Sequence, residues 1–367
     1  MPNRDWTSLL DVPAFPADAY APLADRIAAL LGTKNDVLLI QAEAVVALEA
    51  VATSLARPNL TALNIVTSPY GTWFGSRLTR GGTKVNNLQA EAAKPVLLEQ
   101  VEEALDAAPE TKILALVHAE SASGILNPLE EIVALARQRG ILTIVDAVAS
   151  VGGHQLQVDK LGIDIAVIGP QKSLAGPAGV SALSVSPQAW AFLDRDDAPR
   201  DSILSLIDQK KQWLEKGRGA LPGTPAPLEF YALQAAVDRL EAEGMASIIA
   251  RHASAARATR DAMTALGATL WVPENEASAL VTTIALPHEI SLDDVLARPL
   301  PQQADLTPGV GPGAERILRF NHTGCRATRD AVTANIEAYC SILTHLGIQH
   351  DKQAGLSAIA KIYDQSK

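Results

Sequence analysis

The chain has 367 residues, 48% of them hydrophobic, and a formal charge of −10, so it is long enough for one large domain and a smaller one with well-buried cores. Lys and Arg residues are scattered, which argues against nucleic acid or an anionic membrane as partner and favours small-molecule chemistry. Cys325 and Cys340 are the only cysteines, too few for a disulfide framework, and a cytoplasmic location is expected. No segment reaches the roughly 18 apolar residues of a membrane span.

After an N-terminal segment, 1–20, short aliphatic runs alternate with amphipathic helical segments. This alternation is typical of an α/β fold in which helices cover both faces of a mainly parallel sheet. Strands are expected at 37–40, 62–66, 112–118, 142–148, 163–168 and 180–185. One helix is expected after Asn127, which would cap it, with Pro128 in its first turn and Gly140 at its end.

Two long helical patterns follow, at 227–243 and 245–266, ending at Gly244 and Gly267. Beyond them, apolar runs at 280–286 and 317–320 and a helical pattern at 327–346 predict a smaller α+β domain. We therefore expect a large domain over 21–244 and a small C-terminal domain over 245–367.

Two polar residues emerge where expected buried strands end. Asp146 follows an aliphatic run, and Lys172 follows the next one in the sequence Ile-Gly-Pro-Gln-Lys. Ligands of open α/β sheets bind outside the carboxyl ends of the strands, so both side chains are expected in one crevice. A lysine there can form an imine with an aldehyde, and a carboxylate can keep a pyridine ring protonated as an electron sink. Either residue alone would more often be a solvated lysine or a helix cap.

The surrounding motifs resemble the class V branch of the pyridoxal-phosphate fold type I aminotransferases. The similar segments are HAESASG at 118–124, VDAVASVGG at 145–153 and GPQK at 169–172, in the same order as in the family. The resemblance implies that Lys172 is the imine lysine and Asp146 the pyridinium partner. It also implies that Gln171 contacts the ring hydroxyl, that Ser121 and Val148 lie beside the cofactor, and that alanine-glyoxylate and serine-pyruvate enzymes are near relatives.

Further residues are assigned by the same resemblance. Tyr70, in the segment SPYG, matches the aromatic residue that stacks on the ring, a suitable platform for a cationic pyridinium. Arg319 matches the arginine that binds the substrate carboxylate, a task suited to a planar guanidinium. Thr224 matches a residue placed at a shared site in family homodimers, so a homodimer is implied. The histidine spacing fits no metal motif, and no metal is expected.

One position departs from the usual family pattern. The turn that should bind the cofactor phosphate at a helix N-terminus reads Ala42, Glu43, Ala44, and the partner-subunit tyrosine that often holds the phosphate is replaced by Leu221. A carboxylate would repel a phosphate dianion at close range. Glu43 and Ala44 are therefore expected to line a site for the unphosphorylated vitamin, as in the branch that converts pyridoxamine and pyruvate to pyridoxal and L-alanine.

Three alternatives remain beside this reading. The protein could hold pyridoxal phosphate permanently and exchange amino groups between alanine or serine and glyoxylate or pyruvate. It could be a lyase or cysteine desulfurase that uses Cys325, although the arginine motif already explains that segment. It could also be a vitamin B6-binding module without turnover, which the joint presence of Asp146, Lys172 and Arg319 argues against.

Overall fold

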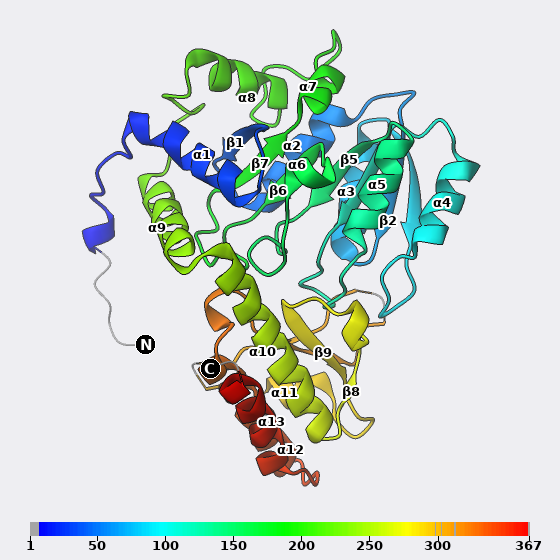
Figure 1. The fold of residues 1–367 in the computed structure, drawn as a ribbon, viewed down its shortest axis with the longest axis vertical. Helices are drawn as coiled ribbons and strands as arrows, with labels where there is room; N and C mark the ends of the chain where they lie inside the picture. The colour runs from blue at the N-terminus through cyan, green and yellow to red at the C-terminus, as the bar shows by residue number, and fades with distance from the viewer. Residues whose placement is uncertain (1–6, 298, 302, 312, 366–367) are drawn as a thin grey trace.

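The computed structural model describes residues 7–297, 299–301, 303–311 and 313–365. Figure 1 shows a large sheet with its helices in the upper half, and a second, smaller sheet below it. The long helix α10 (Met245–Ala265) runs from one half to the other. No helix in these described ranges is long and apolar enough to cross a membrane.

The large sheet has seven strands in the order β1-β7-β6-β5-β4-β2-β3. Six of them confirm expected strands: β1 (Asp36–Ile40), β2 (Thr61–Val66), β4 (Ile113–Val117), β5 (Leu142–Asp146), β6 (Ile165–Ile168) and β7 (Ser181–Val185). Their side chains are almost all buried, as expected for strands covered on both faces. The sequence analysis missed β3 (Lys84–Gln89), a largely polar edge strand with alternating exposure.

Strand direction decides what meets at the edge of this sheet. Strands β2, β4, β5 and β6 are mutually parallel. Strand β7 is antiparallel to both β6 and β1, so β1 runs in the same direction as the parallel group. The carboxyl ends of these five strands therefore lie at one edge.

The helices of this half are α1 (Tyr20–Leu30), α2 (Ala44–Leu55), α3 (Pro69–Arg80), α4 (Leu98–Ala107), α5 (Leu129–Gln138), α6 (Val158–Leu161), α7 (Pro187–Leu193) and α8 (Leu206–Gln212). The 3-10 turns η1 (Thr7–Leu9) and η2 (Ala17–Ala19) precede them; residues 1–6 of the expected N-terminal segment lie outside the described residues.

The expected cap of α5 is wrong. Asn127 is buried, and its amide donates to the Val117 carbonyl oxygen at 2.8 Å while its oxygen accepts from the Val96 N–H at 3.3 Å. The helix begins at Leu129, with Pro128 at the N-cap position and no side-chain cap. The Asn127 side chain therefore makes tertiary hydrogen bonds instead of capping α5.

Helices α9 (Pro227–Glu243) and α10 confirm the two long helical patterns, and lead to an antiparallel sheet in the order β10-β11-β9-β8. Its strands are β8 (Thr269–Leu270), β9 (Val281–Ala285), β10 (Leu306–Pro308) and β11 (Ile317–Asn321), with α11 (Leu292–Leu296), α12 (Arg329–His345) and α13 (Lys352–Gln365) packed around them. One buried apolar cluster fills the upper half, and a second fills the lower half.

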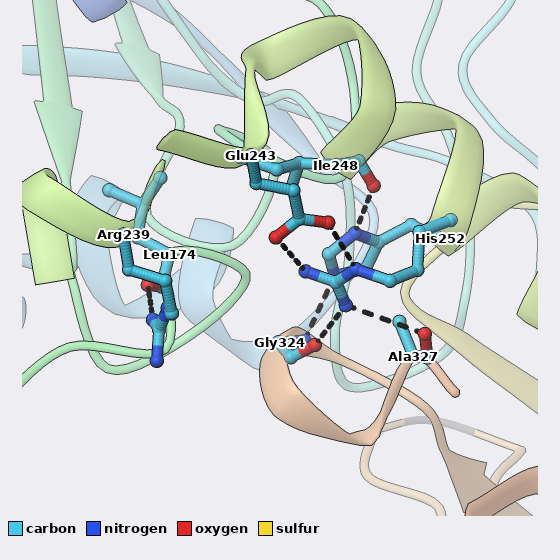
Figure 2. Close-up of polar contacts among 8 residues, drawn as sticks. Leu174, Arg239, Glu243, Ile248, His252, Gly324 and Ala327 are labelled. Atoms are coloured by element: carbon cyan, nitrogen blue, oxygen red, sulfur yellow. Dashed lines mark hydrogen bonds and ion pairs between the residues drawn. The ribbon is translucent and has the colours of Figure 1, made fainter. Parts of the chain in front are cut away.

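Figure 2 shows hydrogen bonds around Gly324, in the loop after β11, that link this loop to α10, while an ion pair links α10 to the end of α9. Arg251 of α10 donates to the Gly324 carbonyl oxygen at 2.6 Å and is paired with Glu243 at 2.7 Å. His252 Nδ1 lies 2.8 Å from the Ile248 carbonyl oxygen, which can only accept. Nδ1 therefore carries the proton, and Nε2 accepts from the Gly324 N–H at 2.9 Å.

Gly324 also presses against the loop that carries Lys172. Its φ of +65° is in the left-handed region, and a Cβ placed there would lie 2.7 Å from the Lys172 carbonyl oxygen. From the other side, Arg239 of α9 donates to the Leu174 carbonyl oxygen at 2.8 Å. The Lys172 loop is therefore restrained by Gly324 of the lower half and by Arg239 of α9.

Substituting Gly324→Ala should lower the free energy of unfolding by roughly 2 kcal/mol or more, because a strained φ and a backbone clash combine. The matched control is Gly347→Ala: its φ is +70°, but nothing lies within 4 Å of the added Cβ, so only the cost of about 1 kcal/mol for a left-handed alanine applies. Urea denaturation measures both. Equal losses in the two variants would show that the Lys172 contact has no energetic role.

Candidate active site

Five expected site residues lie at or after the ends of β1, β2, β4, β5 and β6, which run in one direction. Glu43 follows β1, Tyr70 follows β2, and Ser121 follows β4. Asp146 is the last residue of β5, and Lys172 lies in the loop after β6. The strand directions thus bring these residues to a single edge of the sheet.

Asp146 lies in a poorly solvated place. Burial raises its pKa to about 6, whereas the Val148 N–H and the nearby Lys172 amine oppose that rise and Glu43 adds to it. The Val148 N–H donates to Asp146 Oδ1 at 3.0 Å. A cation beside this carboxylate would favour its charged form, and a protonated pyridine nitrogen is such a cation.

Lys172 is half-buried, and its backbone is held by hydrogen bonds to Gly169 and Ala175. Within the described part of the chain, its amine makes no hydrogen bond or ion pair. The amine is therefore available to an aldehyde, and its charge acts to lower the pKa of Asp146.

Tyr70 stands at the start of α3 and lines a pocket together with Asp146. Ser68 caps the helix by accepting from the Tyr70 N–H at 3.2 Å. The Tyr70 side chain is 47% exposed, so one part of it remains open to a ligand.

Glu43 does not point freely into solvent. It is the N-cap of α2, and its Oε2 accepts from the Val45 N–H at 2.8 Å. Its Oε1 accepts from Gln171 Nε2 at 2.5 Å. The carboxylate therefore occupies the helix N-terminus that would otherwise bind an anion.

Gln171 keeps one unused atom. Its amide nitrogen is engaged by Glu43, while the buried Oε1 has no hydrogen-bond partner among the described residues. A buried unpaired acceptor is costly, and the hydroxyl of a bound ring would satisfy it.

Arg319 of β11 reaches this site from the lower sheet. Its Nη1 donates to the Ser121 carbonyl oxygen at 2.7 Å and its Nε to Thr307 Oγ1 at 3.1 Å. Burial lowers its pKa from the ordinary value. No carboxylate forms an ion pair with it within the described ranges, so a positioned, partly desolvated cation is available to an anionic substrate.

The remaining expected residues lie farther from these contacts or contribute through the backbone. Ala44 is buried as the first residue of α2, and Val148 is half-buried against the core. Ser121 contributes its carbonyl oxygen to Arg319. Thr224 is exposed in the segment before α9, where Gln41 donates to the nearby Pro222 carbonyl oxygen at 2.6 Å.

The residues fit a vitamin B6 ring. The arrangement offers an amine, a carboxylate for the ring nitrogen, an aromatic face and the unpaired acceptor of Gln171. The site is less suited to a phosphate group, because Glu43 already fills the α2 N-terminus.

Two neighbouring residues were not identified as functional from the sequence. Thr307, on the three-residue strand β10, orients Arg319, but nothing in its local pattern signals this. Glu120 lies within the HAESASG motif and is fully buried; a carboxylate shortly after an aliphatic strand was the signal that could have drawn attention to it.

Comparisons with known proteins identify the family of the chain. Residues 16–299 match the family model described as aminotransferase class-V. A pyridoxamine–pyruvate transaminase of Mesorhizobium japonicum is 30% identical over 353 residues, covering 94% of this chain and 88% of the relative. An alanine–glyoxylate aminotransferase of Callithrix jacchus is 30% identical over 321 residues, covering 85% and 77%.

The fold comparison points the same way. The crystal structure of pyridoxamine-pyruvate aminotransferase from Mesorhizobium loti superposes with a TM-score of 0.89 at 28% identity, covering 96% of this chain and 90% of the other. With the family match over most of its length, the chain belongs to the class V aminotransferases, fold type I enzymes that use pyridoxal phosphate.

Proposed function

We propose that this aminotransferase takes the unphosphorylated vitamin as a substrate and converts pyridoxamine and pyruvate to pyridoxal and L-alanine. The observation that carries the proposal is the Glu43 carboxylate, which caps α2 and is bonded to Gln171. A phosphate dianion would have to displace this carboxylate and then remain beside it. At about 4 Å, with an effective dielectric constant near 20, two like unit charges repel by about 4 kcal/mol.

Bound in this site, the vitamin supplies an electron-withdrawing pyridine ring and a carbon that exchanges carbonyl for amine. Asp146 accepts a hydrogen bond from the protonated ring nitrogen and keeps the proton there. Tyr70 covers one face of the ring. Arg319 binds and orients the carboxylate of the amino or keto acid. The Lys172 amine, which has no hydrogen-bond or ion-pair partner among the described residues, removes and returns the proton at the substrate carbon.

The proposal includes a homodimer in the cytoplasm, with Thr224 beside the site of the partner subunit. It is supported by the family resemblance and by the exposure of Thr224. Light scattering during size-exclusion chromatography measures the oligomeric state directly.

The first test is an absorbance titration of ligand-free protein with pyridoxal and with pyridoxal phosphate, on wild type and on Glu43→Gln and Glu43→Ser. Wild type should bind pyridoxal and turn over with L-alanine while binding the phosphate ester poorly. Both variants should bind the phosphate ester at least about tenfold more tightly, which corresponds to only 1.4 kcal/mol of relieved repulsion. Glu43→Ser should gain more because it also makes room.

Glu49→Gln is the matched control, since Glu49 lies on the same helix but pairs with Arg77 at 3.3 Å, away from the N-terminus. It should leave the preference unchanged. Tight binding of the phosphate ester by wild type, with turnover between alanine or serine and glyoxylate, would overturn the proposal and favour a permanently held pyridoxal phosphate.

Arg319→Lys should raise the KM for pyruvate by about 10- to 100-fold, because a lysine lacks the planar fork that pairs with a carboxylate. Arg326→Lys is the control, as Arg326 pairs with Asp305 at 3.1 Å instead. Steady-state kinetics over a range of pyruvate concentrations distinguishes the two. An unchanged KM in Arg319→Lys would remove Arg319 from the carboxylate site.

A further inference from the structure

Glu120, in the loop after β4, is a charged residue type with no exposed surface. Its Oε1 accepts from Thr67 Oγ1 at 2.6 Å, and its Oε2 is buried without a hydrogen-bond partner among the described residues. Complete burial of an ionised carboxylate with one unused oxygen is expensive. The side chain therefore needs either a proton or a function that offsets this cost.

Glu120 supports the turn that presents Tyr70. Thr67, which donates to Glu120, also accepts from Asn127 Nδ2 at 3.0 Å. The next residue, Ser68, is buried beside Glu120 and accepts from the Tyr70 N–H. The loop after β4 and the turn after β2 are thus tied together beneath the aromatic ring.

The charged neighbour of Glu120 is Asp146 on β5. The groups facing Glu120 from the turn after β2 are the hydroxyls of Thr67 and Ser68, which are neutral. Burial and Asp146 together raise the pKa of Glu120 to about 7, although the two hydroxyls oppose the rise. Two carboxyl groups in one poorly solvated site do not readily ionise together. Glu120 and Asp146 can therefore differ in protonation state and serve different roles.

We infer that Glu120 is a positioning residue that acts in its neutral, protonated form: it holds the Thr67–Tyr70 turn in place under the ring and leaves Asp146 as the charged partner of the pyridine nitrogen. Ionisation of Glu120 would place a second negative charge in the site and disturb the turn. This inference rests on the aminotransferase activity of the family and holds for either form of the vitamin.

The test compares Glu120→Gln, which is neutral and of the same size, with Glu120→Ala, which removes the side chain. Thr67→Val keeps the carboxyl group but removes the hydroxyl that binds it. Glu103→Gln, at an exposed position of α4, is the control. The readouts are the pH profile of kcat/KM and the binding of 4-deoxypyridoxine or its phosphate, ring analogues without an aldehyde, to ligand-free protein.

Glu120→Gln should keep kcat/KM near neutral pH within about twofold and should lack the decline expected for wild type as the pH rises through about 7. Glu120→Ala and Thr67→Val should each weaken analogue binding about tenfold, since a turn with an unpaired buried group no longer holds the ring platform. Three results would overturn the inference. They are an equal loss of analogue binding in Glu120→Gln and Glu120→Ala, a pH profile of Glu120→Gln identical to that of wild type, and unaltered analogue binding in both Glu120→Ala and Thr67→Val.

A measurement without ligand tests the protonation state by itself. The folded-state pKa of Glu120 is raised from 4.5 to about 7, so its stabilisation is complete below pH 4.5 and is lost as the pH rises through 7. Glu120→Gln cannot undergo this loss. Its urea midpoint should therefore increase relative to that of wild type between pH 5 and pH 8. A constant difference over that range would show that Glu120 is already ionised in the folded protein.

Discussion

The common direction of β1, β2, β4, β5 and β6 is the constraint on which the site depends. It follows from β7, which is antiparallel to both of its neighbours and so restores the direction of β1 at the far side of the sheet. If β1 ran the other way, Glu43 would emerge at the opposite edge and could not reach Gln171. The strand directions therefore bring the Glu43 carboxylate to the same site as Lys172 and Asp146.

The balance of charge around the site follows from that convergence. Glu43, Glu120 and Asp146 bring carboxyl groups to a region where the nearby cations are Lys172 and Arg319. Each carboxyl group is treated differently by its surroundings. Glu43 is stabilised by a helix N-terminus and an amide, Asp146 by a backbone N–H and Lys172, and Glu120 by the neutral hydroxyls of Thr67 and Ser68. These surroundings favour the ionised form of Glu43 and Asp146 and the protonated form of Glu120.

Much of this arrangement could be predicted from the sequence because buried parallel strands have a strong signature. The aliphatic runs located six of the large-sheet strands, and the motifs placed Asp146 and Lys172 beyond two of them. The polar edge strand β3 lacked that signature, because half its residues face solvent. Asn127 looked like a helix cap because capping is a local rule, whereas its actual partners, Val96 and Val117, are set by tertiary structure.

The contacts across the junction were beyond sequence reasoning for the same reason. Nothing near Thr307 or Gly324 indicates that one orients Arg319 and the other touches the Lys172 loop. Such pairs depend on how two separately packed cores meet. The roles proposed for Arg319 and Lys172 come from resemblance, whereas the contacts that hold these residues in place required the three-dimensional structure.

The absence of an anion cup at α2 has a consequence for turnover. A phosphate bonded to a helix N-terminus anchors a cofactor that must stay bound while its substrates change. A vitamin that is itself a substrate must leave after each reaction, and strong anchoring would slow its release without helping the chemical step. A carboxylate that fills the N-terminus from within the chain satisfies the helix, and in the proposed reaction the ring would be held by other contacts, among them those of Asp146, Tyr70 and Gln171. The weaker hold expected from those contacts is consistent with the proposed use of the vitamin as a substrate.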